Sequence, residues 1–508
     1  MHSISFVSKK RSLCGNASVP ALAAMIVTAA VFGGAGAALA TDLVAASVKV
    51  SPGVDHPSAS VKVSGTGFGA SEAVDIYFDT TDELLGVTDS SGAFRPYPMS
   101  VSAGALPGTH WITAVGRRDG IAAQKTFTVR TDWPEIGFTP KGKRANPYEN
   151  VLSPGTVSSL DTAWTAITGG NVNASPAVVN GNVYVTSNDH NLYAFNATTG
   201  AKLWSAPMGD YSNSSPAVAN GAIYVGANDG KLYAFNEKTG APLWTATTGA
   251  QIESSPAVAS GVVYVGSDDA NLYAFNATTG AVVWNIGLPN KVTASPAVAN
   301  GAVYVDDSAD LFAYDATTGA QLWHLGGLTL NASPAVANGT LYVGANNGYL
   351  AAVDPASGTI LWEQSIGGPV TSPAVANGIV YVGSGAGSLY ALNATTGAKL
   401  WTATPYFITT SPTVANGVVY VGVDVTPQEN ELYAFDAATG AALWGAPMGT
   451  SLIQSSPTVA NGMVYVGSDD FNLYAFALDG GGHAAYRRNA KAPFLSDLHP
   501  DWRLKPAR

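Results

Sequence analysis

The sequence predicts an all-β protein, an eight-bladed β-propeller preceded by a small β-sandwich. Three observations predict it. A unit of about forty residues recurs eight times, with the wording "SPAVANGAIYVGANDGKLYAFNEKTGAPLW" or close to it. Each unit holds four short apolar runs separated by tight-turn residues, as the strands of one propeller blade would be. Charged residues make up only 12% of the chain, against about 25% in ordinary soluble proteins, which suits strands and uncharged turns.

Length and charge restrict the function classes. The 508 residues exceed one ordinary domain, and the formal net charge of −11 argues against a nucleic-acid partner, which needs basic surfaces. Residues 1–40 resemble an export signal. Lys9, Lys10 and Arg11 form a basic start, an uncharged stretch follows, and "ALA" at 38–40 fits a cleavage site. An uncleaved membrane anchor is the alternative. Cleavage removes Cys14, the one cysteine, so we expect no disulfide, no thiolate metal site and no membrane span in the mature protein.

Residues 44–131 alternate polar and apolar residues at strand spacing between Gly, Ser, Asp and Pro turns, which predicts about seven short strands and a β-sandwich. The string "VKVSGTGFGASEAVDIYFD" resembles the immunoglobulin-like modules of exported bacterial proteins, which act as spacers or adhesive units. Residues 132–158 are rich in Pro and Gly, carry a basic cluster at Lys141, Lys143 and Arg144, and are predicted to be a linker.

The repeats occupy residues 159–480. Two positions recur in every unit, a serine followed by proline and a tryptophan at the end of the fourth run. The serines are Ser175, Ser215, Ser255, Ser295, Ser333, Ser372, Ser411 and Ser456. The tryptophans are Trp164, Trp204, Trp244, Trp284, Trp323, Trp362, Trp401 and Trp444. The array begins with a lone tryptophan run and ends with three runs that lack one, so the two ends together complete the eighth blade and close the ring.

Strings such as "AFNATTGAKLW", "AYDATTGAQLW" and "AFDAATGAALW" resemble the A-x-D-x-x-T-G-x-x-x-W motif of pyrroloquinoline-quinone-type propeller repeats. The resemblance covers about two-thirds of the chain. It implies that each tryptophan docks on the next blade near the T-G turn, a structural role. Four copies carry Asn where the family prefers Asp, at Asn196, Asn236, Asn276 and Asn393. Either side chain can bond the backbone of its own turn, so we expect no change in the fold.

The resemblance implies two possible functions. Some members are quinoprotein dehydrogenases that hold the quinone with arginine, calcium, a stacking tryptophan and often a disulfide between adjacent cysteines. Others resemble the outer-membrane β-barrel assembly lipoprotein, which binds proteins without a cofactor. Residues 151–480 contain no arginine, five lysines and 21 Asp and Glu, a formal charge of −16. All eight tryptophans of this span are docking residues. An anionic quinone is poorly matched to this composition, so we predict no cofactor, with quinone and calcium as the alternative.

No other pattern predicts catalysis or a metal site. His190 and His324 occupy different places in their repeats, so both are expected to face solvent. The paired acids at Asp268–Asp269, Asp306–Asp307 and Asp469–Asp470 fall where other units have Asn-Asp-Gly or Asn-Asn-Gly, so they are interpreted as hairpin-turn residues. The sequence therefore predicts no catalytic residue and no metal ligand.

The position two residues before each serine differs between the units and is therefore a candidate for binding. This position is polar in seven units and is expected to line the mouth of the central channel, where it could bind a small ligand or a partner protein or simply be wet lining. The predicted mouth residues are Asn173, Asn213, Glu253, Thr293, Asn331, Thr409 and Gln454, with Val370 in the remaining unit.

The basic tail at 481–508 either folds back on the acidic ring, reaches an anionic surface or stays disordered. The prediction is an exported, non-catalytic binding scaffold in the cell envelope, periplasm or medium, with a quinone-dependent alcohol or sugar dehydrogenase, or a relic of one, as the alternative.

Overall fold

A computed structural model describes residues 45–330, 332–426, 429–448, 451–478 and 488–489. The predicted signal peptide, Asn331 and the predicted tail apart from residues 488–489 lie outside the described residues. Those two residues form a short strand, β43 (Arg488–Asn489), which pairs with β7 (Gly108–Gly116) in parallel. Among the described residues the only helical element is the 3-10 turn η1 (Val157–Ser159), and no helix is long and apolar enough to cross a membrane. The predicted all-β class is confirmed.

The first described segment is a two-sheet sandwich. One sheet has the order β1-β3-β6 and the other contains the path β2-β8-β7-β4-β5. The strands other than β7 are β1 (Ser47–Ser51), β2 (Val54–Asp55), β3 (Ser60–Thr66), β4 (Ala73–Phe78), β5 (Thr81–Val87), β6 (Phe94–Ser100) and β8 (Ala122–Val129). Strand β1 alternates exposed and buried residues because its sheet has one solvated face. Val61, Ile76 and Phe127 are among the fully buried side chains of the shared core.

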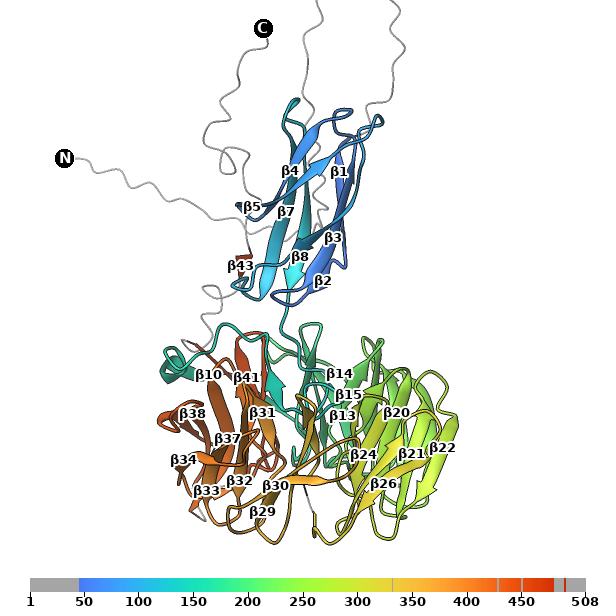
Figure 1. The fold of residues 1–508 in the computed structure, drawn as a ribbon, viewed down its shortest axis with the longest axis vertical. Helices are drawn as coiled ribbons and strands as arrows, with labels where there is room; N and C mark the ends of the chain where they lie inside the picture. Colours follow the sequence, from blue (N-terminus) through green and yellow to red (C-terminus); the bar gives the residue numbers. More distant parts are fainter. Residues whose placement is uncertain (1–44, 331, 427–428, 449–450, 479–487, 490–508) are drawn as a thin grey trace, which may run out of the picture. The chain divides into compact units, whose positions relative to one another are not determined.

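The repeats form propeller sheets, each a meander of four antiparallel strands, and the described residues contain eight of them. Figure 1 labels β20, β21 and β22 side by side in one such sheet. Blades 1 to 3 are β11 (Ala177–Val179), β12 (Asn182–Ser187), β13 (Asn191–Asn196), β14 (Lys202–Pro207); β15 (Ala217–Ala219), β16 (Ala222–Gly226), β17 (Lys231–Asn236), β18 (Pro242–Thr247); and β19 (Ala257–Ala259), β20 (Val262–Ser267), β21 (Asn271–Asn276), β22 (Val282–Gly287). Blades 4 to 6 are β23 (Ala297–Ala299), β24 (Ala302–Asp306), β25 (Leu311–Asp315), β26 (Gln321–Leu325); β27 (Ala335–Ala337), β28 (Thr340–Gly344), β29 (Tyr349–Val353), β30 (Ile360–Ser365); and β31 (Ala374–Ala376), β32 (Ile379–Ser384), β33 (Ser388–Asn393), β34 (Lys399–Ala403).

The last two blades depart from the simple meander. Blade 7 holds β36 (Thr413–Ala415), β37 (Val418–Thr426), β38 (Glu429–Asp436) and β39 (Ala442–Pro447), with β35 (Phe407–Ile408) beside β37 and β9 (Ala145–Asn146) beside β36. Blade 8 joins both ends of the array, because β10 (Leu160–Ile167) pairs with β42 (Asn472–Leu478), next to β41 (Met463–Gly467) and β40 (Thr458–Ala460). This pairing confirms the predicted closure. A ring closed in this way leaves no open blade at either end of the array.

The two central strands of each blade contain a continuous buried run because both of their faces are covered. Strand β16 is buried at every position, and β17 is buried at its four central positions. A short continuous apolar run of this kind is typical of a strand packed on both sides. The outer strand β18 is exposed at four of its six positions instead. The core therefore lies between neighbouring blades.

Each tryptophan docks one blade on the next. The Trp244 Nε1–H donates to the Ala277 carbonyl at 3.1 Å, and a Cβ added to Gly280, whose φ is +72°, would lie 2.6 Å from the indole. Only glycine fits there. Equivalent bonds to a carbonyl of the next blade are donated by Trp164, Trp284, Trp323, Trp362, Trp401 and Trp444, and Trp204 lies against Gly240. Each such burial contributes about 2 kcal/mol to stability.

The turn before each tryptophan strand is capped as the sequence predicts. Asn196 Oδ1 accepts hydrogen bonds from the backbone N–H groups of Thr198 and Thr199, both at 3.0 Å. Asp315 accepts the same pair in blade 4, from Thr317 and Thr318. An amide oxygen and a carboxylate oxygen therefore cap the turn in the same way, and the turn is the same in copies with Asn and with Asp.

Candidate functional site

The serines that mark each repeat form a ring of hydrogen bonds, the serine ring, around the innermost strands. The inner strand of a blade is an edge strand, so its outward N–H groups need partners from outside its own sheet. The Ser215 N–H donates to Ser255 Oγ at 2.9 Å, and the same bond joins seven junctions between consecutive blades. These bonds run from Ser175, Ser215, Ser255, Ser295, Ser333, Ser411 and Ser456. The last, from Ser456 to Ser175 at 3.0 Å, joins blade 8 to blade 1.

One end of the central channel is filled by residues 133–146, the channel segment, which lie within the predicted linker. The segment passes the inner strands of the blades in order. The backbone of Trp133 exchanges two bonds of 2.7 Å with Val178 in blade 1, and the Pro134 carbonyl accepts from Val218 in blade 2. Further along, the Lys141 carbonyl accepts from Val336 in blade 5.

Every blade contributes to this contact. The remaining bonds are Val258 N–H to Glu135 Oε2, Val298 N–H to the Pro140 carbonyl, Val375 N–H to the Lys143 carbonyl, Val414 N–H to the Arg144 carbonyl, and Asn146 Nδ2 to the Val459 carbonyl. In seven blades the bond saturates the N–H of the same valine of the S-P-x-V repeat. Gly142, with φ of +68°, permits the tight path, because a Cβ there would lie 2.5 Å from the Pro334 carbonyl oxygen. The segment therefore caps this end of the channel and ties all eight inner strands together.

A glutamate three residues after the channel segment strengthens this closure. Glu149 is 3% exposed, and its carboxylate accepts bonds from the backbone N–H groups of Val151, Leu152 and Gly462 and from Thr131 Oγ1. Four donors compensate the desolvation of this buried charge. Because Gly462 belongs to the turn between β40 and β41, Glu149 joins the segment to blade 8.

Buried charged groups line a small cavity at the capped end. Its volume is about 20 Å³, and its lining includes Glu135, Thr139 and Arg144 from the channel segment together with Ser295 and Ser333 of the serine ring. Burial raises the pKa of Glu135 to about 8 and lowers the pKa of Arg144 to about 10. Arg144 Nη1 and Thr139 Oγ1 are buried without a hydrogen-bond partner among the described residues. Sequence reasoning missed this cluster because the sequence of 132–158 is typical of a linker.

The predicted mouth residues lie at the other end of the inner strands. Asn173 Nδ2 donates to Asn213 Oδ1 at 3.2 Å across the junction of blades 1 and 2. Glu253 accepts a bond of 3.2 Å from Gln251 Nε2, and its pKa is raised by burial and then by the charge of Asp268. Gln454 donates to Asp469 at 3.1 Å. The structure thus brings Asn173 and Asn213 together and draws Glu253 and Gln454 toward neighbouring turn residues.

The other mouth positions make no such contact across blades in the described structure. Thr409 bonds back to its own blade through its N–H and hydroxyl, both to the Gly422 carbonyl. Val370 forms a bridge to Ser384 within blade 6. Thr293 is half-buried, and Asn331 lies outside the described residues. The predicted mouth set is therefore polar but not uniform.

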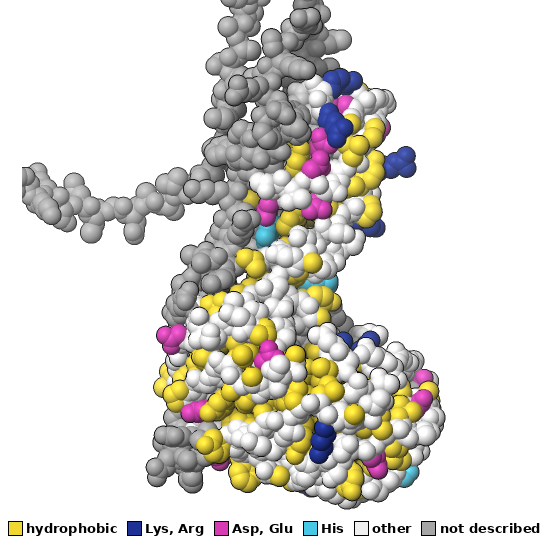
Figure 2. All heavy atoms as spheres, turned by 60° about the vertical axis from the view of Figure 1, so that its left-hand side comes forward, with side chains coloured by type: hydrophobic (Ala, Val, Ile, Leu, Met, Phe, Trp, Pro, Cys, Tyr) yellow, Lys and Arg dark blue, Asp and Glu magenta, His cyan; other side chains and the backbone are white. Residues whose placement is uncertain are grey.

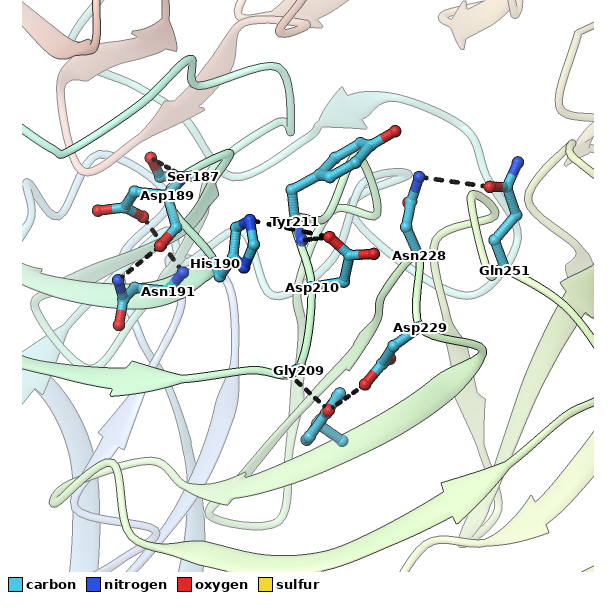
Figure 3. A network of polar contacts seen from close by, with 11 residues as sticks. Ser187, Asp189, His190, Asn191, Gly209, Asp210, Tyr211, Asn228, Asp229 and Gln251 are labelled. Atoms are coloured by element: carbon cyan, nitrogen blue, oxygen red, sulfur yellow. Dashed lines mark hydrogen bonds and ion pairs between the residues drawn. The ribbon is translucent and has the colours of Figure 1, made fainter.

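Turn residues between the second and third strands add a set of polar atoms that the sequence interpretation treated as turn chemistry alone. Asn228 Nδ2 donates to Gln251 Oε1 at 3.4 Å, as Figure 3 shows. Gln251 Nε2 in turn donates to Asp268 Oδ2 at 2.9 Å. The same Asp268 oxygen forms an ion pair with Lys291. Five oxygens near the mouth are buried without a partner among the described residues. They belong to Asn173, Asn188, Asn228, Asp268 and Asp469. Four of them, those of Asn188, Asn228, Asp268 and Asp469, recur at one place in the repeat, the turn after the second strand, and this recurrence is the signal that could have found them.

Both histidines of the ring are partly exposed. The side chain of His190 is 50% exposed and lies 3.8 Å from Asp210, as Figure 3 shows, and that of His324 is 43% exposed and bonds Asp310 at 2.9 Å. They lie in different blades and share no partner. Within the part of the chain that the structure describes, no group of three or more His, Cys, Asp or Glu side chains is arranged to hold a metal ion.

Comparison with known proteins agrees with the fold. Residues 153–253, 228–371, 309–406 and 405–496 match the family described as "Outer membrane protein assembly factor BamB". Since the matched segments span well over half of the chain, the protein belongs to this family of pyrroloquinoline-quinone-type propellers. Among curated proteins no sequence match is found.

Solved structures from two functional classes share this fold. The quinohemoprotein alcohol dehydrogenase of Comamonas testosteroni is 17% identical with a TM-score of 0.60, over 72% of this chain and 82% of that one. BamB of Moraxella catarrhalis is 18% identical with a TM-score of 0.55, over 63% and 99%. A europium-containing methanol dehydrogenase is 16% identical with a TM-score of 0.60, over 68% and 98%. At these identities the likeness concerns the fold alone.

Proposed function

We propose that the protein is an exported, non-catalytic propeller that binds a small polar ligand or a partner protein at the open mouth of its channel. The observation that carries this proposal is the set of buried oxygens without partners at that end, among them those of Asn173, Asn228 and Asp268. A buried acceptor without a donor costs free energy, and a ligand with hydroxyl or amide N–H groups would satisfy it.

The channel segment supports the choice of this end. It lies against the inner strands of all eight blades at the opposite end, so the inner edges there are already occupied by the protein's own chain. The cavity beside Arg144 has a volume of about 20 Å³, and a separate pocket of about 410 Å³ is lined by residues 143–149 and the inner strands of blades 5 to 7. The surface elsewhere offers few charged anchors. Figure 2 shows single charged side chains scattered among hydrophobic and uncharged ones over the repeat region. The acidic balance of the ring also makes a nucleic-acid partner unsuitable.

A quinone cofactor, which the dehydrogenase relatives suggest, does not fit the described residues. Residues 151–480 supply no arginine, and the arginine that enters the ring, Arg144, lies buried at the capped end. The eight tryptophans lie against the neighbouring blades, so none is free to stack on a ring system at the mouth. We derive no catalytic step through such a group. A quinone-dependent dehydrogenase remains the alternative, favoured by the fold it shares with the two dehydrogenases.

A reconstitution experiment distinguishes the two functions. The purified protein is incubated with pyrroloquinoline quinone and calcium, and the absorbance of bound quinone and dye reduction with alcohols and sugars are measured. We expect neither. Quinone binding with turnover would replace the scaffold proposal by the dehydrogenase. N-terminal sequencing of the protein recovered outside the cytoplasm tests the export step, with a new N-terminus near residue 41 as the expected result.

The binding surface is tested with variants at the mouth. The wild type, an N173A/N228A/D268N variant and a K238A control are immobilised and exposed to envelope extract and culture supernatant. Lys238 is exposed in the turn before the tryptophan strand, away from the mouth. We expect the wild type and the control to retain the same protein or small molecule and the mouth variant to lose it. Equal retention by all three would contradict a site at the mouth.

A further inference from the structure

The capped end of the channel holds a cation without a partner. The Arg144 side chain is 4% exposed, and no ion pair to it is found among the described residues. Its Nη1 atom is buried and donates no hydrogen bond. Removing an ion from water costs several kcal/mol unless an opposite charge or several acceptors replace the water. A buried guanidinium in this state indicates that a group other than the described residues compensates it.

The space beside Arg144 limits what that group can be. The cavity of about 20 Å³ has room for one water molecule or one ion of similar size. A second unsatisfied donor, Thr139 Oγ1, belongs to the same lining, and its hydroxyl is also buried without a partner. Ser295 and Ser333 lie around the same space, and their hydroxyl oxygens accept N–H bonds within the serine ring. A guanidinium and a hydroxyl with free donors favour a small acceptor of negative charge.

Glu135 is the other titratable side chain in the lining, and it does not neutralise Arg144 directly. No ion pair joins the two residues, and Glu135 Oε2 accepts the Val258 N–H at 3.3 Å. Burial raises the pKa of Glu135 to about 8, so its carboxyl group is protonated at neutral pH. Arg144, with its pKa lowered to about 10 by burial, stays charged under the same conditions. The cavity therefore carries an excess positive charge below pH 8.

We infer that the capped end of the channel is a binding site for a small monovalent anion of the halide class, held by Arg144 Nη1 and Thr139 Oγ1. The anion neutralises the guanidinium and bonds two residues of the channel segment beside the inner strands of blades 4 and 5. It thereby fastens the segment that ties the eight blades. This site is separate from the mouth of the proposed function and depends on none of its residues.

Bromide tests the site because it replaces chloride and can be located by its anomalous scattering. Crystals of the full chain are grown or soaked in sodium bromide near pH 6.5, and Tm is measured in sodium bromide and in sodium gluconate at equal ionic strength. We expect an anomalous peak beside Arg144 Nη1 and a saturable rise in Tm of about 2 °C or more in bromide. The control R95Q, at an exposed arginine, should keep the response, and R144Q and T139V should weaken or abolish it.

Three results would overturn the inference. They are a cavity that holds a water molecule bridging Arg144 and Glu135, a bromide peak with no bromide-specific rise in Tm, and an equal rise in R144Q and R95Q. If R144Q does not fold, the anomalous map of the wild type and the Tm response of the milder T139V variant still test whether the anion binds.

Discussion

The two ends of the channel are built by different means. The capped end consists of one unrepeated segment, residues 133–146, whose backbone meets a repeated valine N–H in blade after blade. The open mouth consists of repeat positions whose side chains differ, such as Asn173, Glu253 and Thr409. At the capped end one segment makes the same contact with successive blades, and its charged groups Glu135 and Arg144 are buried. At the mouth the backbone repeats from blade to blade while the side chains differ.

This difference shows how a ring of near-identical blades acquires a unique structure. Eight inner edge strands present backbone groups that their own sheets leave unsatisfied, and a segment that passes along all of them satisfies one N–H in seven strands and one carbonyl in the eighth. The repeats satisfy serine N–H groups through the serine ring, whereas the valine N–H groups are bonded by the channel segment. At the opposite end the repeats are free to differ without loss of the fold, and we propose that specific recognition takes place there.

The largest effect is expected from Trp133→Ala at the capped end. The indole is 1% exposed, its ring centroid lies 5.2 Å from that of Phe138, and the backbone bonds Val178. Loss of this packing should lower the free energy of unfolding by roughly 3–5 kcal/mol, measured by urea denaturation. Tyr349→Ala, at an aromatic side chain 43% exposed, serves as the control and should cost about 0.5 kcal/mol or less. If both variants lost similarly little free energy of unfolding, packing at the capped end would not be a main source of the ring's stability.

An intermediate effect, dependent on pH, is expected from Glu135→Gln. Because the pKa of Glu135 is about 8 in the folded protein, above its ordinary value of 4.5, the folded state keeps a proton that the unfolded state releases between those pH values. Its contribution is therefore complete below pH 4.5 and is lost as the pH rises to 8. The free energy of unfolding of E135Q minus that of wild type should increase by up to about 1.4 kcal/mol per pH unit across this window. Asp306, with its pKa raised by burial to about 7, adds a slope of the same sign in both proteins and cancels in the difference. A difference that does not change with pH would show that Glu135 is ionised when folded.

The smallest effect is expected from Asn213→Ala at the mouth. The variant removes the 3.2 Å bond from Asn173 and little packing, since both side chains are only partly buried. The free energy of unfolding should fall by about 0.5–1 kcal/mol, measured in the same denaturation series. A loss as large as that of Trp133→Ala would place the mouth, and not the capped end, at the centre of the protein's stability.

Much of the ring was predictable because its contacts repeat. The period, the tryptophan of each unit, the T-G turn and the Asn or Asp that caps it recur at constant spacing, so each predicts the same local geometry in every blade. The pairing of β10 with β42 was predictable from what each end of the array lacked. Trp164 could be assigned to the last blade for that reason alone.

The candidate sites were less predictable because they depend on contacts that no period reveals. Arg144 was visible as part of a basic cluster, but nothing in "KGKRANP" shows that its side chain is buried in the ring. Asn173 and Asn213 were predicted as mouth residues, whereas their bond to each other and the buried oxygen of Asp268 follow only from the packing of adjacent blades.

The sequence by itself determined the repeat, the four strands of each blade and the residues that join one blade to the next, because these depend on short-range patterns repeated eight times. Only the tertiary structure decided where the unrepeated residues lie. Eight closed blades create an inner surface that exists in no single repeat, and the path of residues 133–146 along that surface buries Arg144 and Glu135 beside one small cavity. The physical reason is that an inner edge needs its hydrogen bonds satisfied, and the chain that satisfies them comes from outside the repeats.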